Sequence, residues 1–160
     1  MRGEIDLVPV HEYRGAVKVL YEMLRERSEE ADEFVNISHR ALPAWREHCA
    51  YVRRRPYRAW YLIIGPTDLP GPARSIPKQV LGQIYATRLN EIGIVLLRAY
   101  RGKGVGAEAV KAITERHKPL AATAGRRAGH WLANINPRNE RSIRLFEGLG
   151  FKHLQNTYQL

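Results

Sequence analysis

The sequence predicts an α+β fold in which helices cover the faces of a mixed, mostly antiparallel β-sheet. Three strand-like segments lie between residues 59 and 98, and the last two are close enough to form a hairpin. A further strand-like segment, residues 130–135, lies between two helical segments, so a crossover must connect it to the sheet. Hairpins mixed with crossovers are typical of a layered α+β domain. We therefore expect one domain over residues 1–160, with six or seven strands and about four helices.

The chain begins with a short strand and continues with two helices. Residues 5–10 alternate in polarity as a strand does. Residues 11–27 carry apolar side chains at helical spacing, which predicts an amphipathic helix. A second helix should start near Pro43, because proline is favoured in a first helical turn, and it should end before Pro56.

The middle of the chain supplies most of the expected sheet. Residues 59–64 form a continuous apolar run that predicts a strand buried on both faces. Residues 65–79 contain four prolines and two glycines and are expected to form an extended loop. Residues 80–88 and 91–98 then predict two strands, with Leu89-Asn90 as the tight connection between them.

The last third alternates helices and strands. A helix is expected from Gly106 to about residue 117, followed by the strand at residues 130–135. Asn139 is a favoured helix cap, and Gly150 is a typical helix stop, so a final helix should lie between them. Residues 151–160 are long enough for one or two closing strands.

Composition limits the classes of partner and compartment. Lysine and arginine number 26 against 16 aspartate and glutamate, and the resulting net charge of +10 attracts polyanions, phosphorylated cofactors included. An alternative interpretation is that the positive surface charge serves only to keep the protein soluble. No apolar run is long enough to span a membrane, and the N-terminus lacks the pattern of a signal peptide. With Cys49 as the single cysteine, we expect a cytoplasmic protein.

The most informative segment is a glycine-rich turn between a hydrophobic strand and a helix. It reads Arg101-Gly102-Lys103-Gly104-Val105-Gly106. Glycines allow close approach of a ligand to the backbone, and the following helix start offers unpaired N–H groups and a positive dipole end. Two cations add full charge, so the turn is a candidate pyrophosphate cradle. Its spacing matches neither a Walker A loop nor the Gly-x-Gly-x-x-Gly of dinucleotide folds.

Two motifs carry a resemblance to a known family. Arg101, Gly104 and Gly106 match the pattern Arg/Gln-x-x-Gly-x-Gly/Ala after a hydrophobic strand. Residues 133–151 look like the fifth strand and following helix of the same family, and they end in Glu-x-Leu-Gly-Phe. On these motifs the chain resembles the GNAT superfamily of acetyl-CoA-dependent N-acetyltransferases. The resemblance covers about residues 80–160.

The resemblance implies where the acetyl donor, acetyl-CoA, would bind. In such a fold the fourth and fifth strands are splayed, and the donor lies between them. Backbone groups of Ile94, Val95 and Leu96 would then bind the pantetheine arm like an added strand. Asn139 would lie beside that arm, although a plain helix cap is an equally good interpretation. The residues expected to hold the pyrophosphate are Arg101, Gly102, Lys103, Gly104, Val105, Gly106 and Ala107.

The same resemblance implies direct attack of an amine on the thioester, with both substrates bound at once. The N–H of Leu96 is then the candidate donor to the developing oxyanion. Two expected residues are replaced. Phe146 stands where many members have an acidic tyrosine, and Asn134 stands where some have a strand glutamate. Because coenzyme A leaves tolerably well as a thiolate, a dedicated acid is not essential.

Two residues remain as candidates for the general base. Glu91 enters the fourth strand near a point where some family members carry a glutamate, but a solvated turn residue is an equally good interpretation. His39 lies between the first two helices, where the family usually builds its acceptor site, although a lone histidine is more often an ordinary packing residue.

The acceptor is left open by the sequence. A small amine that is itself anionic, such as a nucleotide-linked amino sugar, would suit the positive charge. Nucleic acid or a protein terminus is the main alternative, and a non-catalytic coenzyme A-binding module is another. The sequence does not decide the oligomeric state, and a homodimer is compatible with it.

Overall fold

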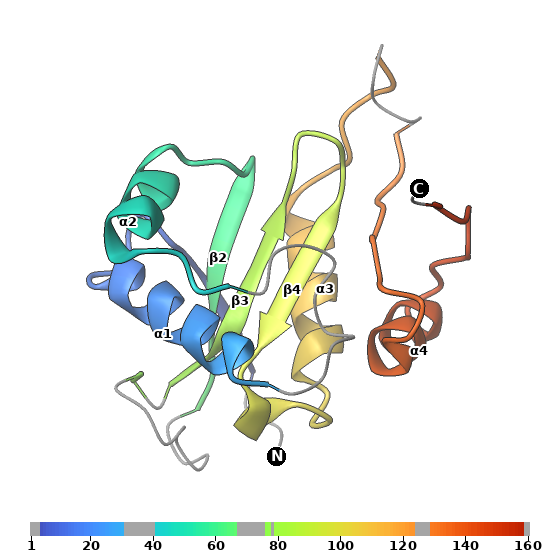
Figure 1. Ribbon diagram of the computed structural model, residues 1–160. Helices are drawn as coiled ribbons and strands as arrows, with labels where there is room; N and C mark the ends of the chain where they lie inside the picture. The colour runs from blue at the N-terminus through green and yellow to red at the C-terminus, as the bar shows by residue number, and fades with distance from the viewer. Residues whose placement is uncertain (1–3, 31–40, 67–75, 78, 124–128, 159–160) are drawn as a thin grey trace.

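The computed structural model describes residues 4–30, 41–66, 76–77, 79–123 and 129–158, and these form an α+β fold around an antiparallel sheet. Figure 1 shows the sheet with helices on both sides. His39, one of the two candidate bases, lies outside the described residues.

The order of elements along the chain follows the predicted order as far as the helix at residues 105–116, after which the predicted strand at residues 130–135 is missing. The elements are β1 (Asp6–Pro9), α1 (Ala16–Ser28), α2 (Trp45–Arg53), β2 (Ala59–Ile64), β3 (Val80–Ala86), β4 (Ile92–Leu96), the short 3₁₀ helix η1 (Arg98–Tyr100), α3 (Val105–Arg116) and α4 (Glu140–Gly148).

The four strands lie in the order β1-β2-β3-β4, and each neighbouring pair is antiparallel. β2 and β3 are central and apolar, so both of their faces need cover. A register shift between Ile63 and Ile64 disturbs the pairing of β2 with β3 at one end. β4 is the last strand of the ladder and has one edge that pairs with β3.

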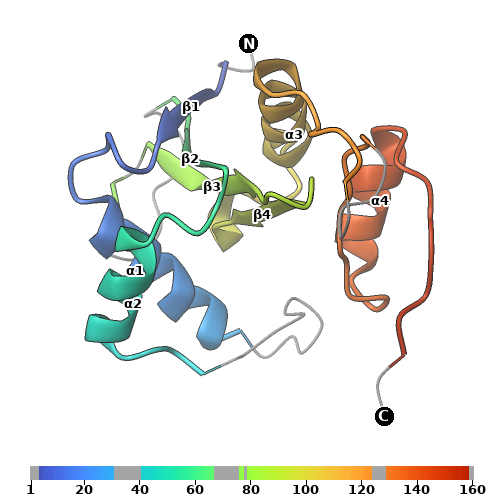
Figure 2. The same ribbon diagram turned by 90° about the horizontal axis from the view of Figure 1, so that it is seen from above.

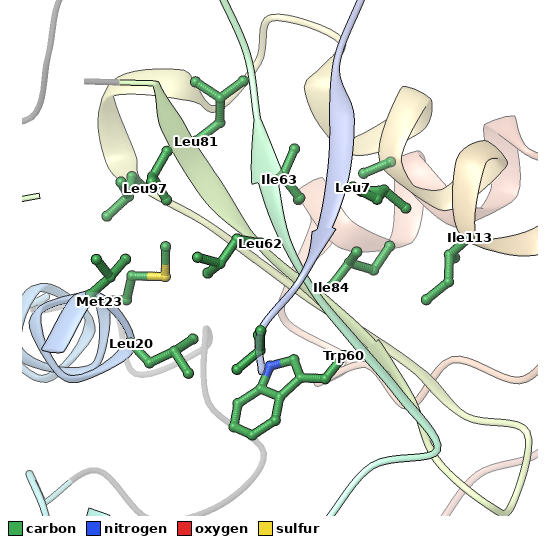
Figure 3. Packing of buried hydrophobic residues seen from close by; sticks show 14 of the residues in the cluster. Leu7, Leu20, Met23, Trp60, Leu62, Ile63, Leu81, Ile84, Leu97 and Ile113 are labelled. Carbon is green, nitrogen blue, oxygen red and sulfur yellow. The ribbon is translucent and has the colours of Figure 1, made fainter. Parts of the chain in front are cut away.

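Helices cover the two faces of this sheet. Figure 2 shows α1 and α2 together on one face and α3 on the other, with α4 beyond α3. Side chains alternate between the faces, as the strand period requires. In Figure 3, Leu62 points toward Leu20 and Met23 of α1, whereas its neighbour Ile63 points to the opposite side. All four of these side chains are 2% exposed or less, so the apolar residues on both faces of the sheet are buried.

The expected strand count was wrong. In the described residues the sheet has four strands rather than six or seven. Residues 130–135 make only an isolated bridge, because this segment departs from β4 after one contact. Residues 151–158 form no strand; they are largely exposed and polar, with Leu154 and Tyr158 directed outward. The sheet is therefore antiparallel, and the bridge is its only parallel contact among the described residues.

No helix within the described ranges is both long and apolar enough to cross a bilayer.

Candidate active site

β4 and the segment after residue 129 meet at one point and then separate. Glu91 and Leu132 form an isolated parallel bridge. The N–H of Ile92 donates to the carbonyl of Leu132 at 2.8 Å, and the N–H of Leu132 donates to the carbonyl of Asn90 at 2.8 Å. Beyond this bridge residues 133–135 form no ladder with β4, and Figure 1 shows that part of the chain apart from the strand. Among the described residues the outer edge of β4 therefore has no strand partner beyond this bridge.

The register decides which backbone groups face that open edge. Toward β3, the N–H of Leu97 donates to the carbonyl of Leu81 at 3.0 Å, and the N–H of Thr87 donates to the carbonyl of Glu91 at 2.9 Å. Successive residues of an antiparallel strand direct these groups to opposite sides. The odd-numbered residues of β4 therefore bond to β3, and the backbone groups of Val95 belong to the sheet rather than to a ligand.

Ile94 and Leu96 face the other way. The outward direction is set by Ile92, whose N–H bonds to Leu132 across the gap. Two residues further along, both backbone groups of Ile94 and the N–H of Leu96 point to the same edge. Of the three residues expected to bind the pantetheine arm, these two present backbone groups, among them the N–H that we assigned to the oxyanion.

The glycine turn after η1 has the backbone shape that a phosphate cradle needs. Gly102 and Gly104 have left-handed φ values of 71° and 87°, and no atom lies within 4 Å of where a Cβ on Gly102 would stand. The backbone at Gly102 is therefore open to the approach of a ligand. Gly106 is different, because its Cβ would lie 3.2 Å from the side chain of Leu145 on α4. Its lack of a side chain lets α3 and α4 pack closely.

The first turn of α3 points its amides into this space. Its first internal bond runs from the N–H of Glu108 to the carbonyl of Gly104 at 3.2 Å. The N–H groups of Val105, Gly106 and Ala107 precede that bond, so the helix itself does not satisfy them. Together with the exposed Lys103, they form a surface that attracts an anion.

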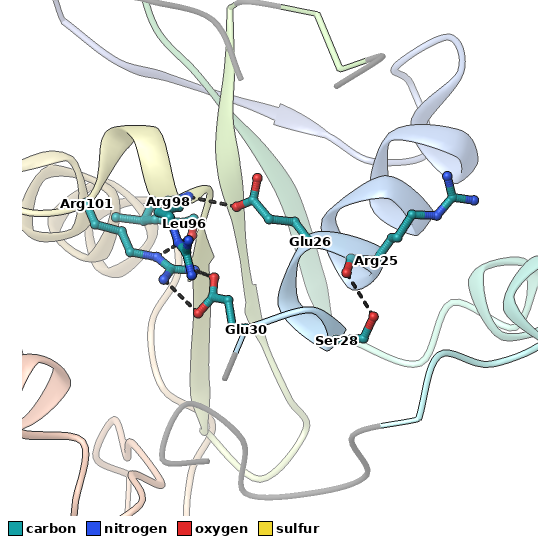
Figure 4. Close-up of polar contacts among 7 residues, drawn as sticks. All are labelled: Arg25, Glu26, Ser28, Glu30, Leu96, Arg98 and Arg101. Carbon is teal, nitrogen blue, oxygen red and sulfur yellow. Dashed lines mark hydrogen bonds and ion pairs between the residues drawn. The ribbon is translucent and has the colours of Figure 1, made fainter. Parts of the chain in front are cut away.

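Arg101 is directed away from the glycine turn. Its Nε donates to the carbonyl of Leu96 at 2.9 Å, and its two terminal nitrogens donate to the carboxylate of Glu30 at 2.9 and 2.5 Å (Figure 4). The side chains of Arg101 and Glu30 are 14% and 3% exposed, so this ion pair is almost entirely enclosed. One turn earlier on α1, Glu26 accepts a bond from the backbone N–H of Arg98 at 2.8 Å. The end of α1 thus holds the end of β4.

Glu91 lies where β4 and residues 130–135, here called the fifth segment, diverge, and its carboxylate is held from two sides. One oxygen accepts from the hydroxyl of Thr87 at 3.1 Å, and the other accepts from the side-chain amide of Asn134 at 2.7 Å. Each carboxylate oxygen has a further lone pair, so both remain able to accept a proton or another hydrogen bond.

The face of β4 toward α1 and α2 carries a group of tyrosines that sequence reasoning did not single out. Tyr85 lies flat across Gly93, where a Cβ would stand 2.1 Å from its ring. Tyr57 stacks on Tyr85 with ring centroids 3.9 Å apart. Burial raises the pKa of both phenols, so they stay protonated and can donate hydrogen bonds. Gly93 is the residue from which this contact could have been predicted, because a glycine inside a strand often marks the place where another group lies close to the backbone.

Arg27 of α1 reaches the same face. Its Nε is buried, and burial lowers the pKa of its guanidinium while the nearby Tyr85, Glu30 and Tyr57 oppose that shift. Because an arginine remains charged at neutral pH even so, this face of the sheet holds a cation close to Tyr85.

The start of α4 and its core residue lie on the other side of the divergence. The side chain of Asn139 accepts from the N–H of Ser142 at 3.1 Å and so caps the helix. Phe146 is 5% exposed and packs edge-to-face against Phe151, with ring centroids 5.0 Å apart. Asn139 has a structural task here, and Phe146 belongs to the core. Among the described residues no group of three or more His, Cys, Asp or Glu side chains could hold a metal ion.

Comparison with known proteins identifies the family of the chain. The family model described as acetyltransferase (GNAT) domain matches residues 5–152. Among curated proteins no sequence matches the chain.

Solved structures share the fold at low sequence identity. A domain from Methanocaldococcus jannaschii is 22% identical with a TM-score of 0.68, covering 97% of this chain and 92% of that one. Spermidine N-acetyltransferase from Vibrio cholerae, in complex with CoA and spermine, is 12% identical with a TM-score of 0.64, covering 95% and 83%. A phosphinothricin acetyltransferase from Sinorhizobium meliloti, in complex with AcCoA, is 17% identical with a TM-score of 0.58, covering 95% and 76%.

Proposed function

Because the chain belongs to the GNAT acetyltransferase family, we propose that it moves the acetyl group of acetyl-CoA to a primary amine on a small anionic molecule. Acetyl-CoA supplies the activated acetyl group as a thioester. The observation that carries the proposal is the open edge of β4, which leads directly into the glycine turn and the first amides of α3.

The residues at that edge fit the donor. A pantetheine arm carries amide groups, and the outward groups of Ile94 and Leu96 can pair with them as an added strand would. The pyrophosphate would meet the N–H groups of the first turn of α3, with Lys103 beside them. The space over Gly102 allows this approach, since a Cβ there would occupy it, and the left-handed φ of Gly104 suits a residue without a side chain.

Two groups then carry the chemistry of this chain. The N–H of Leu96 faces the open edge and would donate to the acetyl oxygen as negative charge develops there. Glu91 would take a proton from the acceptor amine through a chain of water molecules, because about 16 Å of extended strand separates residues 91 and 96. A base is needed because an amine is mostly protonated at neutral pH. The hydrogen bonds from Thr87 and Asn134 orient its carboxylate at the point where β4 and the fifth segment part.

An anionic acceptor is supported by the face on which Glu91 lies. Arg27 supplies a cation there, and the phenol of Tyr85 supplies a hydrogen-bond donor above β4. A carboxylate or phosphate on the acceptor would bind this pair, while its amine would extend toward Glu91.

A screen of amines with labelled acetyl-CoA tests the proposal. We expect transfer to anionic amines, and we expect Arg27→Gln to raise KM for such an acceptor at least about tenfold while leaving KM for a neutral amine unchanged. Arg25→Gln is the matched control, because Arg25 lies on the same helix with its side chain 44% exposed. Absence of transfer to any amine, with donor binding intact, would indicate a binding module instead.

A further inference from the structure

The open edge of β4 offers several equivalent places for an added strand. The carbonyls of Ile92, Ile94 and Leu96 all point outward, and successive ones are about 7 Å apart along the strand. A pantetheine arm that bonds to this edge would find nearly the same backbone pattern after a shift of two residues. Only one such register can bring the acetyl oxygen to the N–H of Leu96, so the fold needs a device that excludes the others.

Arg101 blocks one of these carbonyls. Its Nε donates to the carbonyl of Leu96 at 2.9 Å, which removes that group as a partner for an amide of the arm. The adjoining N–H of Leu96 points to the same edge and has no backbone partner among the described residues. An amide of the arm therefore cannot bond to the last carbonyl of the strand, whereas this N–H stays available to the acetyl oxygen.

Glu30 keeps Arg101 in this position. Two parallel hydrogen bonds join the guanidinium to the carboxylate, and both side chains are enclosed. Breaking an enclosed pair leaves an uncompensated charge, so an incoming phosphate does not readily draw Arg101 away. Glu26 fixes the neighbouring backbone of η1 through Arg98, which holds the whole end of β4 against α1 (Figure 4).

We propose that Arg101 is a positioning residue that sets the register of the donor on β4, by covering the Leu96 carbonyl while tied to Glu30. The proposal rests on the function proposed above. It assigns to Arg101 a role other than phosphate binding, which its place in the glycine motif had led us to expect.

Two substitutions of Arg101 that differ in one atom distinguish a role in covering the Leu96 carbonyl from a role in binding phosphate. In Arg101→Gln the side-chain amide nitrogen can occupy the place of the arginine Nε and still donate to Leu96. In Arg101→Met the terminal methyl occupies that place and cannot donate. Both substitutions remove the positive charge and the two terminal nitrogens that bond to Glu30. Both are made together with Glu30→Gln, so that no enclosed carboxylate is left unpaired, and Glu30→Gln alone is the reference. Arg25→Met controls for loss of an exposed arginine from the adjoining helix.

The two variants should differ in turnover and agree in phosphate binding. With methionine, a second and unproductive register becomes available, so kcat and KM for acetyl-CoA should fall together by about tenfold and kcat/KM should change little. With glutamine, kcat should stay within about threefold of the reference. Calorimetry should give the same dissociation constant for ADP in all three proteins, because Arg101 does not contact phosphate, and acetyl-CoA should bind the methionine variant at least as tightly as the reference.

Other results would overturn the proposal in distinguishable ways. Equal weakening of ADP in both variants would make Arg101 a phosphate ligand. Equal kinetic constants in both variants, with or without a lower melting temperature, would make the contact with Leu96 irrelevant to the donor's position. If the reference protein binds acetyl-CoA but the binding does not depend on Gly104, the proposed donor site itself is misplaced, and this is measured separately below.

Discussion

The side-chain amide of Asn134 donates to the carboxylate of Glu91 across the divergence of β4 and the fifth segment, at 2.7 Å. The two residues are 43 positions apart in the chain. Asn134 stands where the family resemblance led us to look for a glutamate. In the structure its side chain contacts Glu91, one of the two candidate bases. A glutamate at 134 would face Glu91 at hydrogen-bond distance and repel it. Asparagine instead donates to Glu91 and fixes its orientation.

We expect Glu91→Gln to lower turnover by roughly a hundredfold or more while keeping the fold and donor binding. Glutamine can still accept from Asn134, but it cannot take a proton from the amine. Raising the pH should recover activity, because more of the acceptor then arrives deprotonated. Steady-state pH–rate profiles of both proteins with one acceptor check this.

Glu115→Gln is the control for that experiment, since Glu115 is an exposed glutamate on α3. Superimposable profiles for wild type and Glu91→Gln would remove Glu91 from the chemistry, and the role of base would pass to His39 or to a bound water molecule.

Gly104→Val should abolish donor binding, because the side chain would fill the space over the turn. At one hundred times the dissociation constant, acetyl-CoA should stabilise the wild type by about 2.7 kcal/mol and the variant not at all. Gly150→Val is the control, because the φ of Gly150 is 88° against 87° at Gly104, and a Cβ at Gly150 would meet no atom within 4 Å. Both variants should lose similar intrinsic stability, so thermal shifts with and without donor isolate binding. A normal shift in a folded Gly104→Val protein would contradict the site.

Phe146→Tyr should not raise turnover. Phe146 packs in the core against Phe151, so a tyrosine hydroxyl there would be buried at a cost of about 1–3 kcal/mol unless it finds a partner. Chemical denaturation and kcat, measured on the same preparation, test both parts. A tenfold rise in kcat, about 1.4 kcal/mol off the barrier, would show that protonation of the thiolate limits the reaction.

Asn90→Ala should strongly destabilise the fold. Asn90 is fully buried and has a left-handed φ of 63°. Its side chain donates to the carbonyl of Leu120 at 2.8 Å and accepts from the N–H of Leu120 at 2.7 Å. Alanine leaves those groups unsatisfied, which should cost about 2–4 kcal/mol in urea unfolding. Asn90→Gly loses the same bonds but tolerates the backbone, so it should be about 1 kcal/mol less destabilising. Loss of under about 0.5 kcal/mol in Asn90→Ala would refute this.

His48 should make the fold sensitive to acid. It is 3% exposed, its Nε2 lies 2.8 Å from the carbonyl of Val17, and burial lowers its pKa below the ordinary 6.5 although that hydrogen bond raises it. The unfolded chain then binds the proton more readily, so stability rises with pH. His48 should contribute fully above pH 6.5 and progressively less as the pH falls toward its folded value. Urea unfolding at several pH values checks this, and a His48→Gln protein should show a weaker pH dependence.

The sequence alone determined the helices, the four strands of the sheet and the glycine turn, because each rests on local periodicity and on residues that tolerate special backbone angles. Gly102 and Gly104 could be singled out from spacing, and both have the left-handed backbone that such a turn requires. The fifth strand failed as a prediction because its residues have strand character but the segment departs from the edge of β4 after Leu132.

Only the tertiary structure decided where the candidate site residues point. Whether Val95 or Leu96 faces the open edge depends on the register of β4 against β3, which no local pattern reveals. Arg101 looked like a phosphate ligand from its motif, yet its partner Glu30 is 71 positions away in the chain. A motif specifies the residue types at a turn, whereas the direction of a long charged side chain is set by whichever carboxylate the fold encloses beside it.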